Sequence, residues 1–190
     1  VFIYQGEELG SENGKFNSIE EYDDLNTKDQ YRRALCAGYD EAQSLKFVND
    51  RSRDNSRMPF PWTAEANGGF TSRMPWLKCN DDYAAICAKK QEQDKDSLLH
   101  YYRNLIRIRK DEANRECLIY GEVREIENAV ESVIAFERIA ENGEKIQIWI
   151  NMSDEIQQAD IAEGEILCNN YSETSQKSLN PYQAVIVRRR

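Results

Sequence analysis

A series of short β-strand signals in the last part of the chain restricts the possible folds more than any other feature. Beyond Glu116, apolar segments recur between polar turns and predict strands at 118–126, 130–139, 144–151, 165–168 and 184–187. Isoleucines alternate with other side chains along 146–151, as in a strand with one buried face. The dipeptide Asn142-Gly143 favours a tight hairpin turn between two of these strands. The pattern predicts a small antiparallel all-β domain, resembling a β-sandwich, over residues 116–190.

The first part of the chain combines one strand-like segment with helices. Residues 1–4 form an apolar run typical of a parallel strand buried on both faces, and such a strand needs neighbours. We therefore expect this chain to be cut from a longer protein. Ser18 followed by Glu21 predicts a helix that begins with a capping box, and Asp40 followed by Gln43 predicts another.

A polar loop at 52–62 holds the best candidates for ligand binding. Arg53 and Arg57 stand four positions apart, with Asp54 and Asn55 between them, and two prolines stiffen the backbone that follows. The short polar side chains are expected to hold the guanidinium heads in fixed directions. The alternative interpretation is a solvated turn with an incidental ion pair.

Composition excludes several classes of function. The 34 acidic against 25 basic residues give a net charge of -9, which argues against nucleic acid and anionic membranes as partners. No apolar run approaches the ~20 residues of a membrane span, so we expect a soluble, cytoplasmic protein. The five cysteines show no Cys-x-x-Cys spacing, and the single histidine, His100, lies in a helix expected to begin at Asp96 or Ser97. We therefore expect no metal site, disulfide framework, cofactor or Ser-His-Asp triad.

Four stretches stand in order along the chain: Phe2-Ile3-Tyr4-Gln5-Gly6-Glu7-Glu8-Leu9-Gly10; Ser52 to Trp62; Asn67 to Phe70 with Pro75-Trp76; and Asp96-Ser97 through Tyr101-Tyr102 to Leu105 and Arg109-Lys110. Together they resemble the α-glucosidases of glycoside hydrolase family thirteen, in the branch of the oligo-1,6-glucosidases. That family has a (β/α)8 TIM barrel followed by an antiparallel β domain. The resemblance implies an α+β chain in which 1–4 is the last barrel strand, 1–115 ends the catalytic barrel, and 116–190 is the C-terminal domain.

The resemblance also assigns roles to the polar loop. Arg53 reaches the terminal glucose and Arg57 lines the neighbouring subsite, with Asp54 and Asn55 as supports. Asn26 stands where many relatives carry a glutamate of the leaving-group subsite. Retaining glycosidases need two carboxylates roughly 5 Å apart, and in the family these lie upstream of the last strand. The resemblance therefore implies no catalytic residue in this chain and no activity for the chain alone.

The chain is therefore expected to be the C-terminal part of a retaining α-glucosidase, carrying part of its substrate pocket. The whole enzyme would hydrolyse terminal α-linked glucose from short oligosaccharides. Alternatives in the same branch are a trehalose-phosphate hydrolase, a dextran glucosidase and a sucrose isomerase. A further alternative is a non-catalytic relative that serves as an ancillary or interaction module. Because seven barrel strands are absent, we also expect association with another chain through the exposed barrel face.

Overall fold

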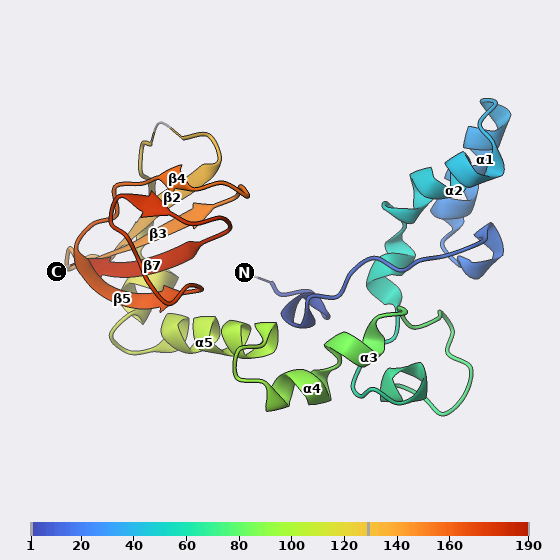
Figure 1. The fold of residues 1–190 in the computed structure, drawn as a ribbon, viewed down its shortest axis with the longest axis horizontal. Helices are drawn as coiled ribbons and strands as arrows, with labels where there is room; N and C mark the ends of the chain where they lie inside the picture. Colours follow the sequence, from blue (N-terminus) through green and yellow to red (C-terminus); the bar gives the residue numbers. More distant parts are fainter. Residues whose placement is uncertain (1, 129, 190) are drawn as a thin grey trace. The chain divides into compact units, whose positions relative to one another are not determined.

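The computed structural model describes residues 2–128 and 130–189. Its internal contacts divide the chain into two compact units, Val1–Tyr102 and Arg103–Arg190. The division falls within helix α5, Leu98–Lys110 (Figure 1).

The first unit is built from short helices and tight turns. The α-helices are α1 (Leu25–Cys36), α2 (Glu41–Asn49), α3 (Tyr83–Ile86), α4 (Ala88–Gln93) and the start of α5, and the 3-10 turns are Glu7–Leu9, Ile19–Glu21, Arg53–Arg57 and Ala66–Gly69. Helices α1 and α2 lie side by side (Figure 1). Beside them, Phe16, Tyr22 and Val48 form a small buried cluster. Leu9, Leu77 and Cys87 are also buried in this unit, outside that cluster.

The strand expected at residues 1–4 is not formed in the described residues 2–4, and Val1 lies outside the described residues. The side chains of Phe2, Ile3 and Tyr4 are exposed, and the Tyr4 carbonyl accepts from the Glu7 N–H at 3.1 Å. A strand requires a neighbouring strand for its hydrogen bonds. Within the described residues none is available to this segment, so the prediction of a local strand was wrong here.

The helix expected at Ser18 begins later. Ser18 precedes only the 3-10 turn Ile19–Glu21 and its side chain makes no capping bond. The longer helix α1 starts after Asp24, whose carboxylate accepts the backbone N–H of Thr27 at 3.0 Å. Aspartate at the N-cap satisfies a donor that has no partner within the helix. The capping signal at Ser18 was thus read at the wrong position.

Two other helix starts agree with the sequence. Asp40 and Gln43 form the predicted capping box at α2, with the Gln43 N–H donating to Asp40 at 2.8 Å. Ser97, one of the two candidates, accepts the backbone N–H of His100 at 3.4 Å at the start of α5. Capping contacts span three or four residues, so the local sequence is sufficient to predict them.

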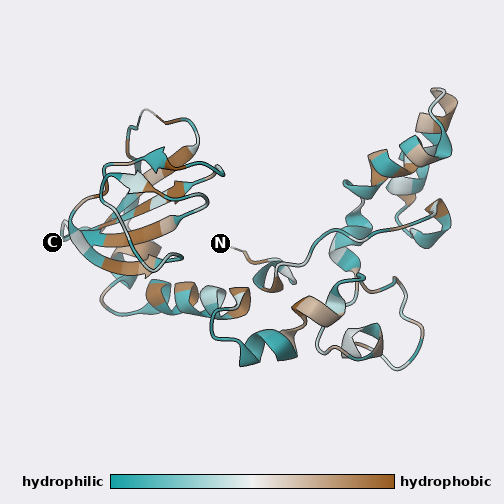
Figure 2. Cartoon of the chain, viewed as in Figure 1, coloured by the Kyte–Doolittle hydropathy of each residue, from teal (hydrophilic) through white to brown (hydrophobic). Residues whose placement is uncertain are grey.

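The second unit is dominated by an antiparallel sheet in the order β1-β2-β3-β7-β5, with a small second sheet formed by β4 and β6. The strands are β1 (Glu122–Glu125), β2 (Val133–Ile139), β3 (Lys145–Asn151), β4 (Gln157–Gln158), β5 (Gly164–Asn169), β6 (Ser178–Leu179) and β7 (Ala184–Arg189). Trp149, Leu179, Val185 and Val187 lie in its buried apolar cluster. Figure 2 shows apolar residues recurring along these strands. The predicted antiparallel arrangement is confirmed.

One expected strand starts later than predicted. Residues Glu116–Tyr120 form a π-helical turn, and β1 begins only at Glu122. The guanidinium of Arg138 donates to the carbonyls of Cys117 and Ile119 at 3.1 and 3.2 Å. Because side-chain donors satisfy these carbonyls, the segment has no need of a strand partner.

The hairpin between β2 and β3 occurs where Asn142-Gly143 predicted it. The Gly143 N–H donates to the Ala140 carbonyl at 2.9 Å, and the Ala140 N–H donates to Glu144 at 2.9 Å. Gly143 has φ 86°, in the left-handed region. This is a three-residue loop with glycine at the left-handed position, a common hairpin geometry.

Candidate functional site

The polar loop folds as a 3-10 turn, Arg53–Arg57, that is anchored by a buried carboxylate. Asp54 is 0% exposed, and one of its oxygens accepts the backbone N–H groups of Asp23 and Asp24 at 2.7 and 2.8 Å. A buried carboxylate is stable only when such donors surround it. Asp54 therefore ties the loop to the segment that precedes α1.

A second buried carboxylate, Asp24, connects the two arginines. One oxygen of Asp24 lies 2.8 Å from Nη2 of Arg53 and 3.7 Å from Nη1 of Arg57. Its other oxygen accepts from the Thr27 hydroxyl at 2.8 Å. Burial would raise the pKa of the Asp24 carboxyl, but the hydrogen bonds from Thr27 and Arg53 outweigh it and lower that pKa. Asp24 is therefore an anion that holds both guanidinium groups at one place.

The arginine heads keep donors available for a ligand. The side chain of Arg53 is 63% exposed and that of Arg57 is 37% exposed. Arg57 also pairs with Asp54 at 3.2 Å. A guanidinium has five N–H donors in a rigid fork, so these ion pairs leave several of them free. Polyhydroxylated ligands offer acceptors that suit such a fork.

Asn55 supports the loop rather than the arginines. Its carbonyl accepts the Gly14 N–H at 3.1 Å, and its amide donates to the Asn49 carbonyl at 2.6 Å. The expectation that Asp54 directs an arginine head is met at Arg57. Sequence reasoning missed Asp24, although an aspartate three residues before Thr27 carries an N-cap signal that could have drawn attention to it.

The loop shares a groove with the segment that begins at Tyr4. Ser52, Asn55 and Ser56 line it together with Tyr4 and Gly6, and its volume is about 340 Å³. Residues far apart in sequence thus meet at this groove.

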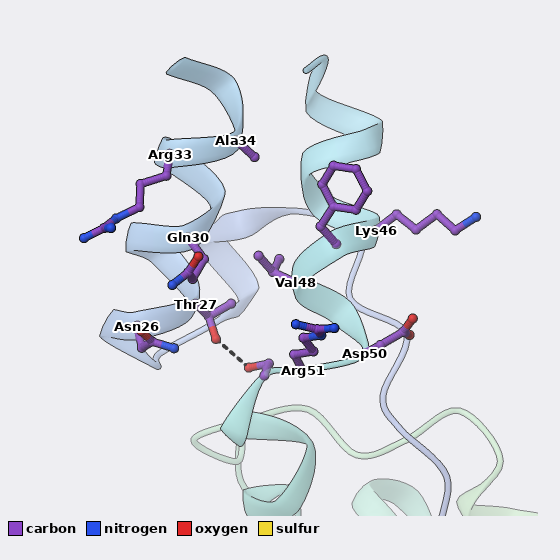
Figure 3. Close-up of a pocket in the computed structure, with 11 residues that line it drawn as sticks. Asn26, Thr27, Gln30, Arg33, Ala34, Lys46, Val48, Asp50 and Arg51 are labelled. Atoms are coloured by element: carbon purple, nitrogen blue, oxygen red, sulfur yellow. Dashed lines mark hydrogen bonds between the residues drawn. The ribbon is translucent and has the colours of Figure 1, made fainter. Parts of the chain in front are cut away.

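Asn26, the third predicted binding residue, lies elsewhere. It lines a larger groove of about 800 Å³ between α1 and α2, together with Gln30 and Arg51 (Figure 3). The described lining of this groove does not include Arg53 or Arg57. The structure brings the two arginines together and places Asn26 in a separate groove.

The described residues contain no group of three or more histidine, cysteine or acidic side chains placed to hold a metal ion. His100 packs at the start of α5, with Nδ1 3.0 Å from the Gln91 carbonyl and 3.1 Å from the Ser97 hydroxyl. Among the helices of the described residues, none has the length and apolar character to cross a bilayer.

Residues 1–121 match the family model for the alpha amylase catalytic domain. The chain belongs to the alpha-amylase family. The oligo-1,6-glucosidase of Bacillus cereus is 33% identical over 196 residues, which cover 97% of this chain and 34% of the relative. The trehalose-6-phosphate hydrolase of Escherichia coli is 32% identical over 97% of this chain and 34% of its own length. The family expected from the sequence is confirmed.

Solved structures of this family have the same fold over almost the whole chain. The trehalose-6-phosphate hydrolase of Bacillus licheniformis gives a TM-score of 0.88 at 30% identity, over 98% of this chain and 35% of that one. The isomaltulose synthase of Erwinia rhapontici gives 0.87 at 34% identity, with the same coverage. The chain spans about a third of the length of the curated relatives that it matches.

Proposed function

We propose that this chain supplies the sugar-binding end of a retaining α-glucosidase that releases terminal α-linked glucose from short oligosaccharides. The observation that carries the proposal is the pairing of Arg53 and Arg57 on the buried carboxylate of Asp24. The matched relatives include oligo-1,6-glucosidases, which supports an oligosaccharide as the substrate. The acidic composition suits a cytoplasmic enzyme.

The proposed roles follow from hydrogen-bonding chemistry. Arg53 donates to hydroxyls of the terminal glucose, and Arg57 donates to the neighbouring sugar. Asn26 lines the groove between α1 and α2, and its proposed role is to present an amide to the leaving group from there. Asp54 and Asn55 hold the loop through the backbone contacts described above. Fixed donors of this kind position a sugar without contributing to bond cleavage.

We propose that the two catalytic carboxylates lie outside this chain. A general acid needs a raised pKa to stay protonated near neutral pH. The Asp24 carboxyl has a lowered pKa, and Asp54 is held by two backbone N–H groups and by Arg57. These two groups suit permanent hydrogen-bond acceptors.

The test is hydrolysis of an aryl α-glucoside by the 190-residue chain, beside the longest protein encoded in the same reading frame. We expect no turnover by the chain alone and measurable turnover by the longer protein. In the longer protein, Arg53→Lys should lower kcat/KM about ten- to hundredfold, because an ammonium cannot reproduce the guanidinium fork. Arg32→Lys, on the exposed side of α1, is the matched control. Turnover by the chain alone, or normal kinetics for Arg53→Lys, would refute the proposal.

The other activities of the branch form the second candidate. Trehalose-6-phosphate hydrolase and isomaltulose synthase match this chain about as well as the oligo-1,6-glucosidases do. A panel of isomaltose, dextran oligosaccharides, trehalose 6-phosphate and sucrose separates the four activities. A longer protein that acts on none of them would favour a non-catalytic, ancillary role.

We also propose that the exposed apolar side chains of the first unit associate with further polypeptide. Phe2, Met74 and Trp76 are 101%, 93% and 67% exposed. Isolated apolar side chains are normal at a surface, but several large ones in one small unit favour a covered face. Light scattering of the chain, with and without the longer protein's preceding residues, tests this proposal.

A further inference from the structure

Two buried hydroxyl groups lie behind the Asp24 carboxylate, at the oxygen that the arginines do not contact. The Thr27 hydroxyl oxygen is 2.8 Å from Oδ2 of Asp24 and 2.8 Å from Oγ of Ser52, the second contact being the dashed line in Figure 3. Oγ of Ser52 accepts the backbone N–H of Asp54 at 3.2 Å. Thr27 and Ser52 are 3% and 7% exposed. This hydroxyl chain therefore joins the first turn of α1 to the turn Arg53–Arg57.

The number of protons fixes the direction of these hydrogen bonds. A hydroxyl has one proton to donate, and an ionised carboxylate can only accept. Burial raises the pKa of the Asp24 carboxyl, but hydrogen bonds from Thr27 and Arg53 lower it further than burial raises it, so Asp24 is ionised. Thr27 therefore donates its proton to Asp24, and Ser52 donates to Thr27.

The hydroxyl chain leaves the Asp24 carboxylate one orientation. Oδ2 accepts both the hydroxyl and the backbone N–H of Thr27, at 2.8 and 3.0 Å. The carboxylate is planar, so fixing Oδ2 also fixes Oδ1, which lies 2.8 Å from Nη2 of Arg53 and 3.7 Å from Nη1 of Arg57. A ligand-binding group acts best when neighbouring hydrogen bonds set its direction in advance.

We propose that Thr27 and Ser52 are positioning residues for the sugar-binding arginines. Thr27 holds the Asp24 carboxylate so that Oδ1 faces Arg53, and Ser52 holds the Thr27 hydroxyl in its donating direction. The effect on sugar binding rests on the proposed function, whereas the hydroxyl chain itself can be tested without a sugar. If the two hydroxyls served only to stabilise the start of α1, the Arg53 guanidinium would not respond to their removal.

The first experiment is NMR of the 190-residue chain and its Thr27→Val variant. The substitution removes the hydroxyl but keeps the branched shape and the backbone N–H that caps α1. We expect the pKa of the Asp24 carboxyl to rise and the Arg53 Nη protons to exchange faster with water. Thr27→Ser, which restores the hydroxyl, should return both quantities toward the parent. Ser18→Ala is the matched control and should change neither, because the Ser18 side chain makes no capping bond.

The comparison of pKa values isolates the hydroxyl group. The charged groups that face Asp24 are Arg53 and Arg57, and Asp54 is paired with Arg57 at 3.2 Å. None of them is altered in Thr27→Val, so a raised pKa in the variant reports the lost hydrogen bond. Ser52→Ala provides a second variant, in which both quantities should move in the same direction by less.

The second experiment measures hydrolysis of an aryl α-glucoside by the longer protein. Thr27→Val should lower kcat/KM about two- to tenfold, the effect of one neutral hydrogen bond. The loss should grow as pH falls, because Asp24 takes up its proton at a higher pH in the variant. In the Arg53→Lys background, Thr27→Val should cost less than in the parent, since both substitutions act on one contact. Thr27→Ser should recover most of the activity.

Two results would overturn the proposal. One is an unchanged Asp24 pKa with unchanged Arg53 exchange in Thr27→Val, or in Ser52→Ala if Thr27→Val does not fold. The other is a loss of kcat/KM in Thr27→Val that simply adds to the loss in Arg53→Lys. Altered NMR signals combined with normal kinetics for Arg53→Lys would confirm the hydroxyl chain and refute the sugar-binding role of Arg53.

Discussion

The two units of this chain achieve order by different means. The second unit has a cluster of seven buried apolar residues that includes side chains of its five-stranded sheet, whereas the cluster beside α1 and α2 in the first unit contains three. The first unit also has the buried carboxylates Asp24 and Asp54, which are held by their hydrogen-bond donors. Contacts between apolar side chains are non-directional, whereas a buried ion network is stable only when every charged or polar group keeps its partner. The first unit should therefore be more sensitive to pH and to polar substitutions, and the second to loss of apolar volume.

The largest effect is expected for Trp149→Ala in the second unit. Trp149 is 2% exposed within the apolar cluster, and its removal should lower the free energy of unfolding by about 3–5 kcal/mol. Urea unfolding, monitored by circular dichroism, measures this loss of free energy. Tyr120→Ala, at a side chain that is 74% exposed, is the control and should change little. Equal effects of the two substitutions would contradict the described core.

The next largest effect is expected for Asp54→Ala in the first unit. The substitution leaves the N–H groups of Asp23 and Asp24 without their acceptor and Arg57 without its closer partner. We expect a loss of about 2–4 kcal/mol, because buried groups of this kind are costly to leave unpaired. Hydrogen exchange at the two amides provides the measurement. If both amides stay as protected as in the parent, Asp54 does not anchor the loop.

A smaller effect is expected from acidification through Asp24. Its pKa is lowered in the folded chain from the ordinary value of 3.8, so the unfolded chain takes up the proton first as pH falls. The stability that Asp24 contributes is therefore complete above about pH 4 and is lost as pH falls through the folded pKa. Asp82 has a raised pKa and acts in the opposite direction, so the informative quantity is the difference between the parent and Asp24→Asn. That difference should shrink on acidification, and a constant difference would contradict the lowered pKa.

The smallest effect is expected for Gly143→Ala in the β2–β3 hairpin. A Cβ at this position meets no atom within 4 Å, so the cost comes only from the φ of 86°. A left-handed backbone costs a non-glycine residue about 1–2 kcal/mol. Thermal unfolding measures the loss, and Glu141→Ala in the same loop serves as the control. A Gly143→Ala chain as stable as the parent would mean that the loop adopts another turn.

Features that depend on neighbouring residues could be read from the sequence. The Asp40–Gln43 capping box and the Asn142-Gly143 hairpin each involve residues within a few positions. Whether residues 2–4 form a strand could not be decided in this way. A strand needs hydrogen bonds to a second segment, and the local pattern does not identify that segment. The proposed domain boundary near residue 115 remains a prediction.

In the candidate site too, some features are evident from the sequence and others only from the fold. The loop with Arg53 and Arg57 stood out in the sequence, since two guanidiniums so close together with short polar neighbours are not core residues. Asp24 lies 29 positions before Arg53 and gave no sign of its contact with it. Asn26 was grouped with the arginines, but the fold places its side chain in the groove with Arg51.

By itself, the sequence determined the family, the antiparallel strands of the second unit and the arginine loop, because each rests on residue types in a short or ordered pattern. Only the tertiary structure decided which carboxylate holds the arginines and which side chains share a groove. Those contacts join segments that are distant along the chain, and only chain folding determines which distant groups come within hydrogen-bonding distance.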